Sequence, residues 1–481
     1  MAIRTAEEYL AGLRDGRTVF QGGGRVEDVT AHPVLGICAD HGATIFRFAH
    51  RKDLRDLFVV SDGEDAPYSR YFAFARNTDD LLRRTELIEK TTEEARSVLN
   101  IIKAIGSDAL FALTVIAHHL DQAKGTDYAP RVAAQLDRCR AGDLSLAVAQ
   151  TDVKGERSKR PHQQEDPDLY VRIVDRRKDG IVVRGAKAHT TMGPVVDEII
   201  VLPTRAMTEG DADYAVAFSL PVATDGLKLV CRPTTHRDQS AFDHPISRHH
   251  IETESVTIFE DVFIPWERVF LCGEWDFAGP LAGLFARFHR FTAISYKPPT
   301  GDMFIGAAQL IAEANGVGGA GHIREKIARL ITYTEIIRAC TKAAALDCER
   351  MEPGGGIAVP NSVYLNVGKH YFASHFHEAS RILQDIAGGL VITQPSEADY
   401  RNPEVHGLLN KYLRGDPSVP TETRLRLFNL IKDLTASDFG GYNYVVTLHG
   451  EGSLEAQTLT TYRDYDLERC KQLVLDALEG P

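Results

Sequence analysis

The stretch HRFTAISYKPPTGDMFIGAAQ, residues 289–309, gathers side chains that could do chemistry. His289 offers an imidazole, which can act as acid and base near neutral pH. Lys297, eight positions further on, could hold an anionic oxygen, and Tyr296 beside it adds a hydroxyl group. The competing interpretation is structural, because His289 lies among phenylalanines, where a lone histidine is more often a packing residue. A catalytic role requires that these groups face one cavity.

Other polar residues could line such a cavity. Glu254, in HHIETESVTIF, lies on an alternating strand-like run and could point inward, or else lie on a solvated strand face. Two polar turns, AQTDVKGERS (residues 149–158) and GAKAHTT (residues 185–191), stand at the ends of strand-like runs. The hydroxyl groups and exposed backbone of GAKAHTT suit a heteroaromatic edge or a phosphate. AQTDVKGERS lies where the helical domain meets the β-domain, and domain junctions are favoured cofactor sites. Composition alone favours a solvated linker for AQTDVKGERS and a surface turn for GAKAHTT.

The glycine-rich stretch GVGGAG, residues 316–321, matches the dinucleotide-binding pattern G-x-G-x-x-G. That site needs a strand before the glycines, whereas a helical segment precedes them here. The stretch therefore predicts an interhelical loop. The chain contains no GxxxxGK[ST] and no GxSxG, which excludes P-loop ATPases and common hydrolases.

Composition narrows the classes further. The 481 residues carry a formal net charge of −12, which disfavours nonspecific nucleic-acid binding. No apolar run reaches the length of a membrane span, and MAIRTAEEYLAGLRDG at the start is typical of an amphipathic helix, not of a signal peptide. The seven cysteines are scattered without metal-site spacing. We expect reduced thiols and a cytoplasmic protein.

The periodicity of apolar residues changes twice along the chain. Helical spacing dominates residues 1–145 and 276–481, and alternating or β-branched runs fill residues 146–275. Lys178-Asp179-Gly180 predicts a hairpin within the middle block, and Pro298-Pro299 predicts a helix break. The order predicts an α+β protein with an N-terminal helical domain, a middle β-domain built as a small barrel or sandwich, and a C-terminal helical bundle.

Five segments together resemble the 4-hydroxyphenylacetate 3-hydroxylase / 4-hydroxybutyryl-CoA dehydratase family over nearly the whole chain. They are DPDLYVRIVDRRKDGIVVRGAKAHTT, FEDVFIPWERVFLCGEWDFAG, GDMFIGAAQLIAEANG, DIAGGLVITQPSEADY and LHGEGSLEAQ, and they are closer to the dehydratase branch. The resemblance implies an acyl-CoA-dehydrogenase-like fold with a middle β-barrel, a homotetramer and bound FAD.

The resemblance also implies positions for the flavin and the substrate. The flavin-binding set comprises Ala149, Gln150, Thr151, Asp152, Gly155, Arg157, Ser158, Thr191, His449, Gly450, Gly452 and Ser453. The candidate catalytic residues are His289, Tyr296, Lys297 and Glu254.

This chain lacks key residues of both branches of the family. The dehydratase branch binds an iron–sulfur cluster through a Cys-x-x-x-Cys pair, a histidine and a further cysteine. In this chain Asn100, Ala104 and Tyr296 stand where the three cysteines should be, and only His289 remains. We therefore expect no cluster and no metal site, with Tyr296 filling the vacated space. The C-terminal glutamate of that branch aligns with Val446.

The hydroxylase branch does not match fully either. Its substrate-binding arginine and tyrosine align with Val98 and Ile102, and its active-site histidine aligns with Ala149. A simple 4-hydroxyphenylacetate substrate is therefore not expected.

These comparisons with the family leave three hypotheses. The first is a two-component monooxygenase that receives reduced FAD from a separate flavin reductase and hydroxylates an aromatic or related small molecule. The second is a cluster-free acyl-CoA dehydratase or isomerase. The third is a flavin-binding protein without catalytic activity.

Overall fold

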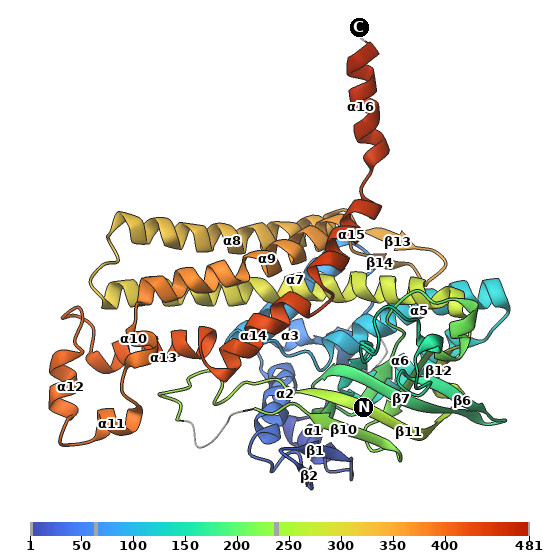
Figure 1. Ribbon diagram of the computed structural model, residues 1–481, viewed down its shortest axis with the longest axis horizontal. Helices are drawn as coiled ribbons and strands as arrows, with labels where there is room; N and C mark the ends of the chain where they lie inside the picture. The colour runs from blue at the N-terminus through green and yellow to red at the C-terminus, as the bar shows by residue number, and fades with distance from the viewer. Residues whose placement is uncertain (1–2, 62–65, 235–239, 480–481) are drawn as a thin grey trace.

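The computed structural model describes residues 3–61, 66–234 and 240–479. Figure 1 shows long helices lying side by side over a region of sheets and shorter helices, with one terminal helix standing clear of the body. The N-terminal elements are α1 (Ala6–Gly12), β1 (Val19–Gln21), β2 (Gly24–Val26), α2 (Leu35–His50), α3 (Arg55–Phe58), β3 (Val59–Val60), β4 (Tyr68–Ser69), α4 (Thr78–Glu94), α5 (Ala104–Lys124) and α6 (Tyr128–Gly142).

The middle strands form two sheets, with six strands in the order β2-β1-β10-β11-β7-β6 and four in the order β12-β9-β8-β5. Their bounds are β5 (Leu146–Ala149), β6 (Arg172–Arg176), β7 (Gly180–Thr191), β8 (Glu198–Val201), β9 (Val216–Pro221), β10 (Leu227–Cys231), β11 (Glu254–Pro265) and β12 (Val269–Cys272). Phe218 of β9 meets Phe259 of β11 edge to face, which packs the sheets together. In the described residues these sheets do not close into the expected barrel.

Local turn chemistry predicted one connection correctly. β6 and β7 pair antiparallel across the Lys178-Asp179-Gly180 turn, closed by a hydrogen bond from Arg177 N to Gly180 O of 2.8 Å. The N-terminal block is less helical than expected, because β1 pairs in parallel with β10, Val19 opposite Leu229. Pairing between segments so far apart in sequence leaves no local signal.

The C-terminal part is a helical bundle that ends in a projecting helix (Figure 1). Its elements are α7 (Trp275–Ala314), α8 (Gly321–Leu346), β13 (Glu349–Met351), β14 (Ile357–Val359), α9 (Ser362–Ala387), α10 (Leu390–Thr393), α11 (Glu397–Arg401), α12 (His406–Tyr412), α13 (Thr421–Thr435), α14 (Asp438–His449), α15 (Leu454–Asp464) and α16 (Leu467–Glu479). The glycine-rich stretch lies between α7 and α8, as the interhelical prediction required. No helix within residues 3–61, 66–234 and 240–479 is long and apolar enough to cross a membrane.

Helix α7 continues through Pro298 and Pro299, so the predicted break is wrong. A proline within a helix leaves the carbonyl four residues earlier without its usual donor. Here the Thr341 hydroxyl of α8 donates to Ile294 O at 2.9 Å, and so replaces the amide that Pro298 lacks. The cost of the proline is offset by a neighbouring helix, and His289, Tyr296 and the proline pair stay on one rigid element.

Close packing of α5 on β5 gives a first prediction. A Cβ added to Gly106 would lie 2.2 Å from Leu146 Cβ, whereas one added to the exposed Gly306 of α7 would meet nothing within 4 Å. We expect Gly106→Ala to lower the free energy of unfolding by about 1–3 kcal/mol, because the overpacking outweighs the better helix propensity of alanine. Gly306→Ala, the matched control, should raise it by up to about 1 kcal/mol. Urea unfolding measures both; equal effects would contradict the packing argument.

Candidate active site

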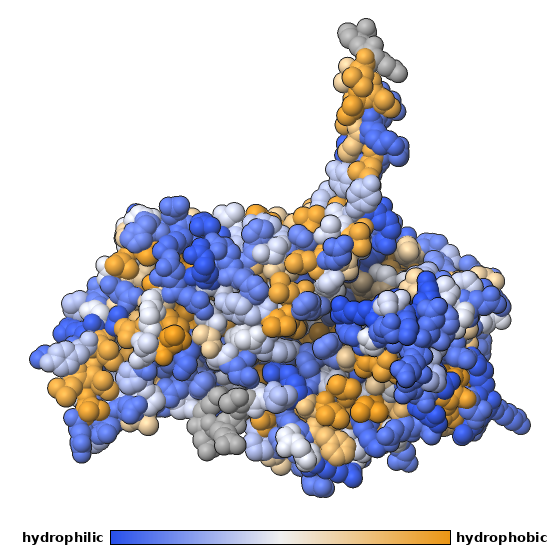
Figure 2. Space-filling view, in the orientation of Figure 1, coloured by the Kyte–Doolittle hydropathy of each residue, from blue (hydrophilic) through white to orange (hydrophobic). Residues whose placement is uncertain are grey.

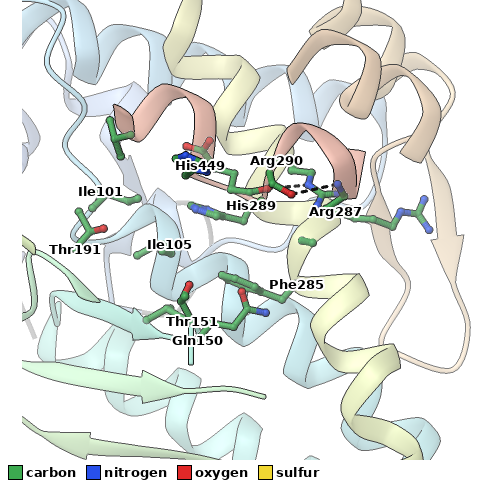
Figure 3. A pocket seen from close by; sticks show the side chains of 18 of the residues that line it. Ile101, Ile105, Gln150, Thr151, Thr191, Phe285, Arg287, His289, Arg290 and His449 are labelled. Atoms are coloured by element: carbon green, nitrogen blue, oxygen red, sulfur yellow. Dashed lines mark hydrogen bonds between the residues drawn. The ribbon is translucent and has the colours of Figure 1, made fainter. Parts of the chain in front are cut away.

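A cavity of about 1990 Å³ lies between the middle sheets and the helical bundle. Its walls come from α5, β5, β7, β11, α7, α9, α14 and the loop before α15. Figure 3 shows how these elements converge, with Gln150 and Thr151 on one side and His289, Arg290 and His449 on the other. The site therefore depends on segments from all three parts of the chain.

One part of the cavity wall carries positive charge without matching acids. Lys154, Arg157 and Arg205 all line the cavity, and in the described part of the chain no carboxylate lies within ion-pair distance of them. Burial and the neighbouring Arg157 lower the pKa of Lys154. Burial, Lys154 and His449 lower the pKa of His189, which lies in the same wall. Such a wall suits an anionic ligand, and a phosphate group has the required charge.

The structure separates the predicted flavin-binding set into two groups. Those that line the cavity are Gln150, Thr151, Arg157, Thr191, His449, Gly450, Gly452 and Ser453. Ala149 is buried away from it, because alternate residues of β5 point to opposite sides and its neighbours Val148 and Gln150 are the ones that line the cavity.

Three further predicted positions shape the turn instead of lining the cavity. Asp152 forms a buried ion pair with Lys187, at 2.6 Å. Gly155 has a positive φ of 51°, and a Cβ there would lie 2.6 Å from Leu169 Cδ2. Ser158 donates to Glu156. These interactions hold the backbone that presents Thr151 and Arg157.

His289 lies in the cavity wall and is held by a buried carboxylate that sequence reasoning missed. Its Nδ1 lies 3.2 Å from Asp108 Oδ2, and Asp108 is fully buried. Asp108 also accepts hydrogen bonds from Arg84 Nη2 at 2.6 Å and Thr292 Oγ1 at 3.0 Å. A carboxylate acceptor places the imidazole proton on Nδ1 and leaves Nε2 as the free nitrogen.

Tyr296 and Lys297 come together around a second missed residue, Glu451. The Tyr296 hydroxyl donates to the Glu451 carboxylate. Lys297 Nζ lies 3.0 Å from Tyr296 Oη and 3.4 Å from Glu451 Oε2. Phe372 covers the ammonium, with its ring centre 4.9 Å from Nζ. The three polar groups form one hydrogen-bonded cluster in the cavity wall.

An unusual backbone conformation delivers Glu451 to this cluster. Its φ of 55° is in the left-handed region, between Gly450 and Gly452. Arg290 Nε pins the turn by donating to Glu451 O at 2.9 Å. A non-glycine residue held in this region is often functional. Val446, the position aligned with the dehydratase glutamate, also lines the cavity from α14, and Glu451 supplies a carboxylate five residues later.

The cluster contains more basic groups than its one carboxylate can pair. Lys369, fully buried on α9, lies 3.5 Å from Glu451 Oε2. Burial, with Arg290 adding, lowers the pKa of Lys369 to about 7. Burial and then Lys369 hold the pKa of Lys297 well below its ordinary value, and burial raises the pKa of Glu451 to about 8 against the effect of Arg290. These groups can therefore donate and accept protons near neutral pH.

Glu254 reaches the cavity from β11 and is fixed by two hydroxyl donors. The Tyr442 hydroxyl donates to its Oε1 at 2.8 Å, and Thr191 Oγ1 donates at 2.9 Å. The predicted flavin residue Thr191 and the predicted catalytic residue Glu254 are thus directly bonded. Burial raises the pKa of Glu254, while the two hydroxyl groups act in the opposite direction.

The residues at the four positions aligned with the family's iron–sulfur ligands do not fit a four-ligand cluster. Asn100 donates through its amide to His41 O at 2.8 Å and to Thr44 Oγ1 at 3.0 Å, and Tyr296 is bonded to Glu451. Ala104 has no ligating atom. Across the residues that the structure describes, no group of three or more His, Cys, Asp or Glu side chains could hold a metal ion.

Comparison with known proteins places the chain in context. Family models described as the N-terminal and C-terminal parts of 4-hydroxyphenylacetate 3-hydroxylase match residues 5–271 and 278–479. The chain is 32% identical to the 4-hydroxybutyryl-CoA dehydratase/vinylacetyl-CoA-Delta-isomerase of Clostridium aminobutyricum, with 98% of both chains covered. It is 29% identical to the 4-hydroxyphenylacetate 3-monooxygenase oxygenase component of Thermus thermophilus, over 98% of this chain and 96% of that protein.

A solved structure agrees with these sequence matches. The oxygenase component of 4-hydroxyphenylacetate 3-monooxygenase complexed with FAD and 4-hydroxyphenylacetate superposes with a TM-score of 0.92 at 28% identity, covering 99% of this chain and 98% of that one. The fold is therefore acyl-CoA-dehydrogenase-like, as the sequence resemblance implied.

Proposed function

The chain belongs to the 4-hydroxyphenylacetate 3-hydroxylase family, and from this premise we propose that it is the oxygenase component of an FAD-dependent, two-component monooxygenase. The observation that carries the proposal is a cavity of about 1990 Å³ with Lys154, Arg157 and Arg205 in its wall. Asn100, Ala104 and Tyr296 meanwhile stand where the family's iron–sulfur cluster has cysteines. Reduced FAD, when bound, supplies the electrons that activate oxygen for transfer to a small-molecule substrate.

The protein's own residues bind the cofactor from two sides. Arg157, Arg205 and Lys154 would hold its phosphates, since they line the cavity and form no ion pair with a described carboxylate. Thr151 and Gln150 offer a hydroxyl and an amide at the edge of β5, and His449 faces them across the cavity (Figure 3). These groups orient the flavin and exclude water from it.

The bundle side of the cavity receives the substrate. Asp108 holds the ring of His289, so that Nε2 is free to take a proton from a substrate hydroxyl. Lys297 and the Tyr296 hydroxyl stabilise the oxygen that gains negative charge. A small aromatic or related organic molecule suits the remaining wall, which includes Phe304 and Phe376.

Rapid mixing tests this proposal. Protein loaded with reduced FAD is mixed with oxygenated buffer and followed by absorbance. We expect a long-lived species that absorbs in the near ultraviolet before oxidised flavin forms. Immediate formation of oxidised FAD, as in buffer alone, would overturn the oxygenase proposal.

A second candidate function has its own observation. Glu451, Lys297 and Lys369 form a buried acid–base cluster, and the chain is 32% identical to a dehydratase and isomerase. Such a cluster could move protons on an acyl-CoA without oxygen, with FAD in a redox-neutral role. Crotonyl-CoA and its β,γ-unsaturated isomer, incubated without oxygen in deuterium oxide, would then incorporate deuterium. Absence of exchange would exclude this alternative.

We further propose that a flavin reductase supplies reduced FAD and that the chain forms homotetramers. Helix α16 projects from the body with apolar side chains exposed (Figures 1 and 2). Val474 and Leu478, one turn apart, are 59% and 77% exposed. An isolated helix of 13 residues is marginal in water, so this stripe needs a partner surface. A second copy of the chain is that partner.

Aspartates introduced into the apolar stripe of α16 test whether the copies associate through it. Val474→Asp combined with Leu478→Asp is expected to reduce the mass measured by size-exclusion chromatography with light scattering. Arg469→Gln combined with Asp476→Asn changes the opposite, polar face without altering net charge and should leave the mass unchanged. An unchanged mass in the first variant would show that α16 does not join the copies.

A further inference from the structure

Glu252, two residues before β11, is a buried carboxyl group with an unpaired oxygen among the described residues. Its side chain lines the cavity and only 8% of the residue is exposed. Oε1 makes no hydrogen bond to any described residue. Buried polar groups are nearly always satisfied, so an unsatisfied one in a cavity wall indicates a group that meets a ligand or solvent.

Glu252 and Glu254 reach the same cavity from one extended segment. Extended backbone continues past the strand end, because Met192 N donates to Thr253 O at 2.8 Å and Arg232 N donates to Glu254 O at 2.9 Å. Residues two apart in such a segment project to one side, about 6.6 Å apart along the chain. Both carboxyl groups line the cavity.

The two carboxyl groups have different surroundings. Glu254 accepts hydrogen bonds from Tyr442 and Thr191, which stabilise its ionised form. Glu252 has no such donor, and burial together with the charge of Glu254 raises its pKa to about 8. Burial raises the pKa of Glu254 as well, but its two hydroxyl donors favour the ionised form. Glu254 is therefore the better base of the two and Glu252 the better acid.

The other charged and titratable groups around Glu252 come from five further segments of the described chain. Arg232, after β10, and Lys297 of α7 favour its ionised form, and Glu451, before α15, opposes it. The charge of Glu252 in turn contributes to the raised pKa of the Tyr442 hydroxyl in α14 and of the Cys38 thiol in α2. The opposing effects of Arg232 and Lys297 do not overcome burial and the two glutamates.

We propose that Glu252 is a catalytic acid that acts with Glu254 as its base on a substrate held between them. Glu254 removes a proton from a substrate carbon, and Glu252 gives a proton to the oxygen or carbon at the other end of the conjugated system. The substrate loses one proton and gains one, no electrons are transferred, and the two carboxyl groups return to their starting states by exchange with water.

This step deepens the proposed function and rests on it for its substrate. Oxygen transfer to a phenol ring first gives a dienone, which becomes a catechol when a ring carbon loses a proton and the oxygen gains one. Shifting a β,γ-double bond of a thioester into conjugation needs the same two transfers. The carboxyl pair therefore serves an oxygenase or an isomerase, and the substrate class is a conjugated, enolisable carbonyl compound.

Infrared spectroscopy of the FAD-loaded full-length protein tests the acid directly and needs no substrate. The C=O stretch of a protonated carboxyl group should be present at neutral pH and disappear as the pH rises through about 8. Glu451, whose pKa is also raised to about 8, contributes a band of its own. The difference spectrum between wild type and Glu252→Gln should therefore contain one titrating carboxyl band, and the difference between wild type and Glu260→Gln, an exposed glutamate further along β11, should contain none. Absence of any protonated band in the wild type would contradict the proposal even if a variant does not fold. A Glu252→Gln difference spectrum without a titrating carboxyl band would overturn the proposal.

The pH dependence of turnover tests the catalytic role. In the assay that the wild type supports, Glu252→Gln should lower kcat by about 10²- to 10⁴-fold and remove the alkaline limb of the profile, whereas Glu254→Gln should remove the acid limb. Glu252→Asp should restore part of the activity. Retention of the alkaline limb in Glu252→Gln would exclude Glu252 as the acid. A titrating band in a protein without either activity would instead contradict the proposed function alone.

Discussion

Replacing Lys297 with methionine is expected to lower turnover by about 10²- to 10³-fold, the usual effect of removing one donor that stabilises a developing negative charge. Lys297 is the residue whose Nζ contacts both the Tyr296 hydroxyl and Glu451 in the cavity wall. Methionine keeps the length and apolar stem but supplies no donor. The loss should fall on kcat, because the interaction strengthens as charge develops.

The measurement is steady-state turnover in the oxygen-dependent or the exchange assay, together with a titration of FAD binding. FAD affinity should stay within a few-fold of wild type, since the cation-lined wall is untouched. Lys342→Met, an exposed lysine of α8, is the control and should retain full turnover. Wild-type turnover in Lys297→Met would place the chemistry outside the Tyr296–Lys297–Glu451 cluster.

Replacing Asp108 with alanine is expected to lower the free energy of unfolding by about 3–5 kcal/mol, as removal of one partner of a buried ion pair does. Arg84 is 7% exposed and Asp108 fully buried, so the guanidinium would lose its carboxylate without gaining water. Thr292 and His289 would lose their acceptor as well. Denaturant unfolding measures the change.

Two controls separate charge from packing. Asp137→Ala removes an exposed aspartate of α6 and should change stability by less than about 0.5 kcal/mol. The double variant Asp108→Leu with Arg84→Met removes both charges and should recover part of the loss, because no buried charge is left unpaired. Thr292 and His289 still lack their acceptor in this variant, so the recovery should be incomplete. A loss below about 1 kcal/mol in Asp108→Ala would show that the Arg84–Asp108 pair does not support this part of the core.

Local sequence signals predicted several elements correctly. The Lys178-Asp179-Gly180 turn joins β6 to β7, and the GVGGAG stretch joins two helices, because turn residues act through their own backbone. The Pro298-Pro299 pair shows the limit of such signals. Whether a proline ends a helix depends on what satisfies the freed carbonyl, and here that group is Thr341 of another helix.

In the candidate site, too, the sequence indicated residue types but not where their side chains point. His289, Tyr296, Lys297 and Glu254 were identifiable from residue type and from family resemblance, and the structure brings all four to one cavity. Glu451 was missed although Gly450 and Gly452 beside it were named, because glycines mark a turn but do not indicate where the residue between them points. The positive φ of Glu451 is the feature that turns its carboxylate toward Lys297.

The sequence by itself determined the order of helical and strand blocks, the family and the residue types at the lost cluster positions, since periodicity, turn chemistry and motif identity are local properties. Tertiary structure alone decided which acids and bases share a cavity. Asp108 reaches His289 across 181 positions and Lys369 reaches Glu451 across 82, and their protonation depends on that burial and proximity. Pairings over such separations arise from packing, and no local pattern encodes them.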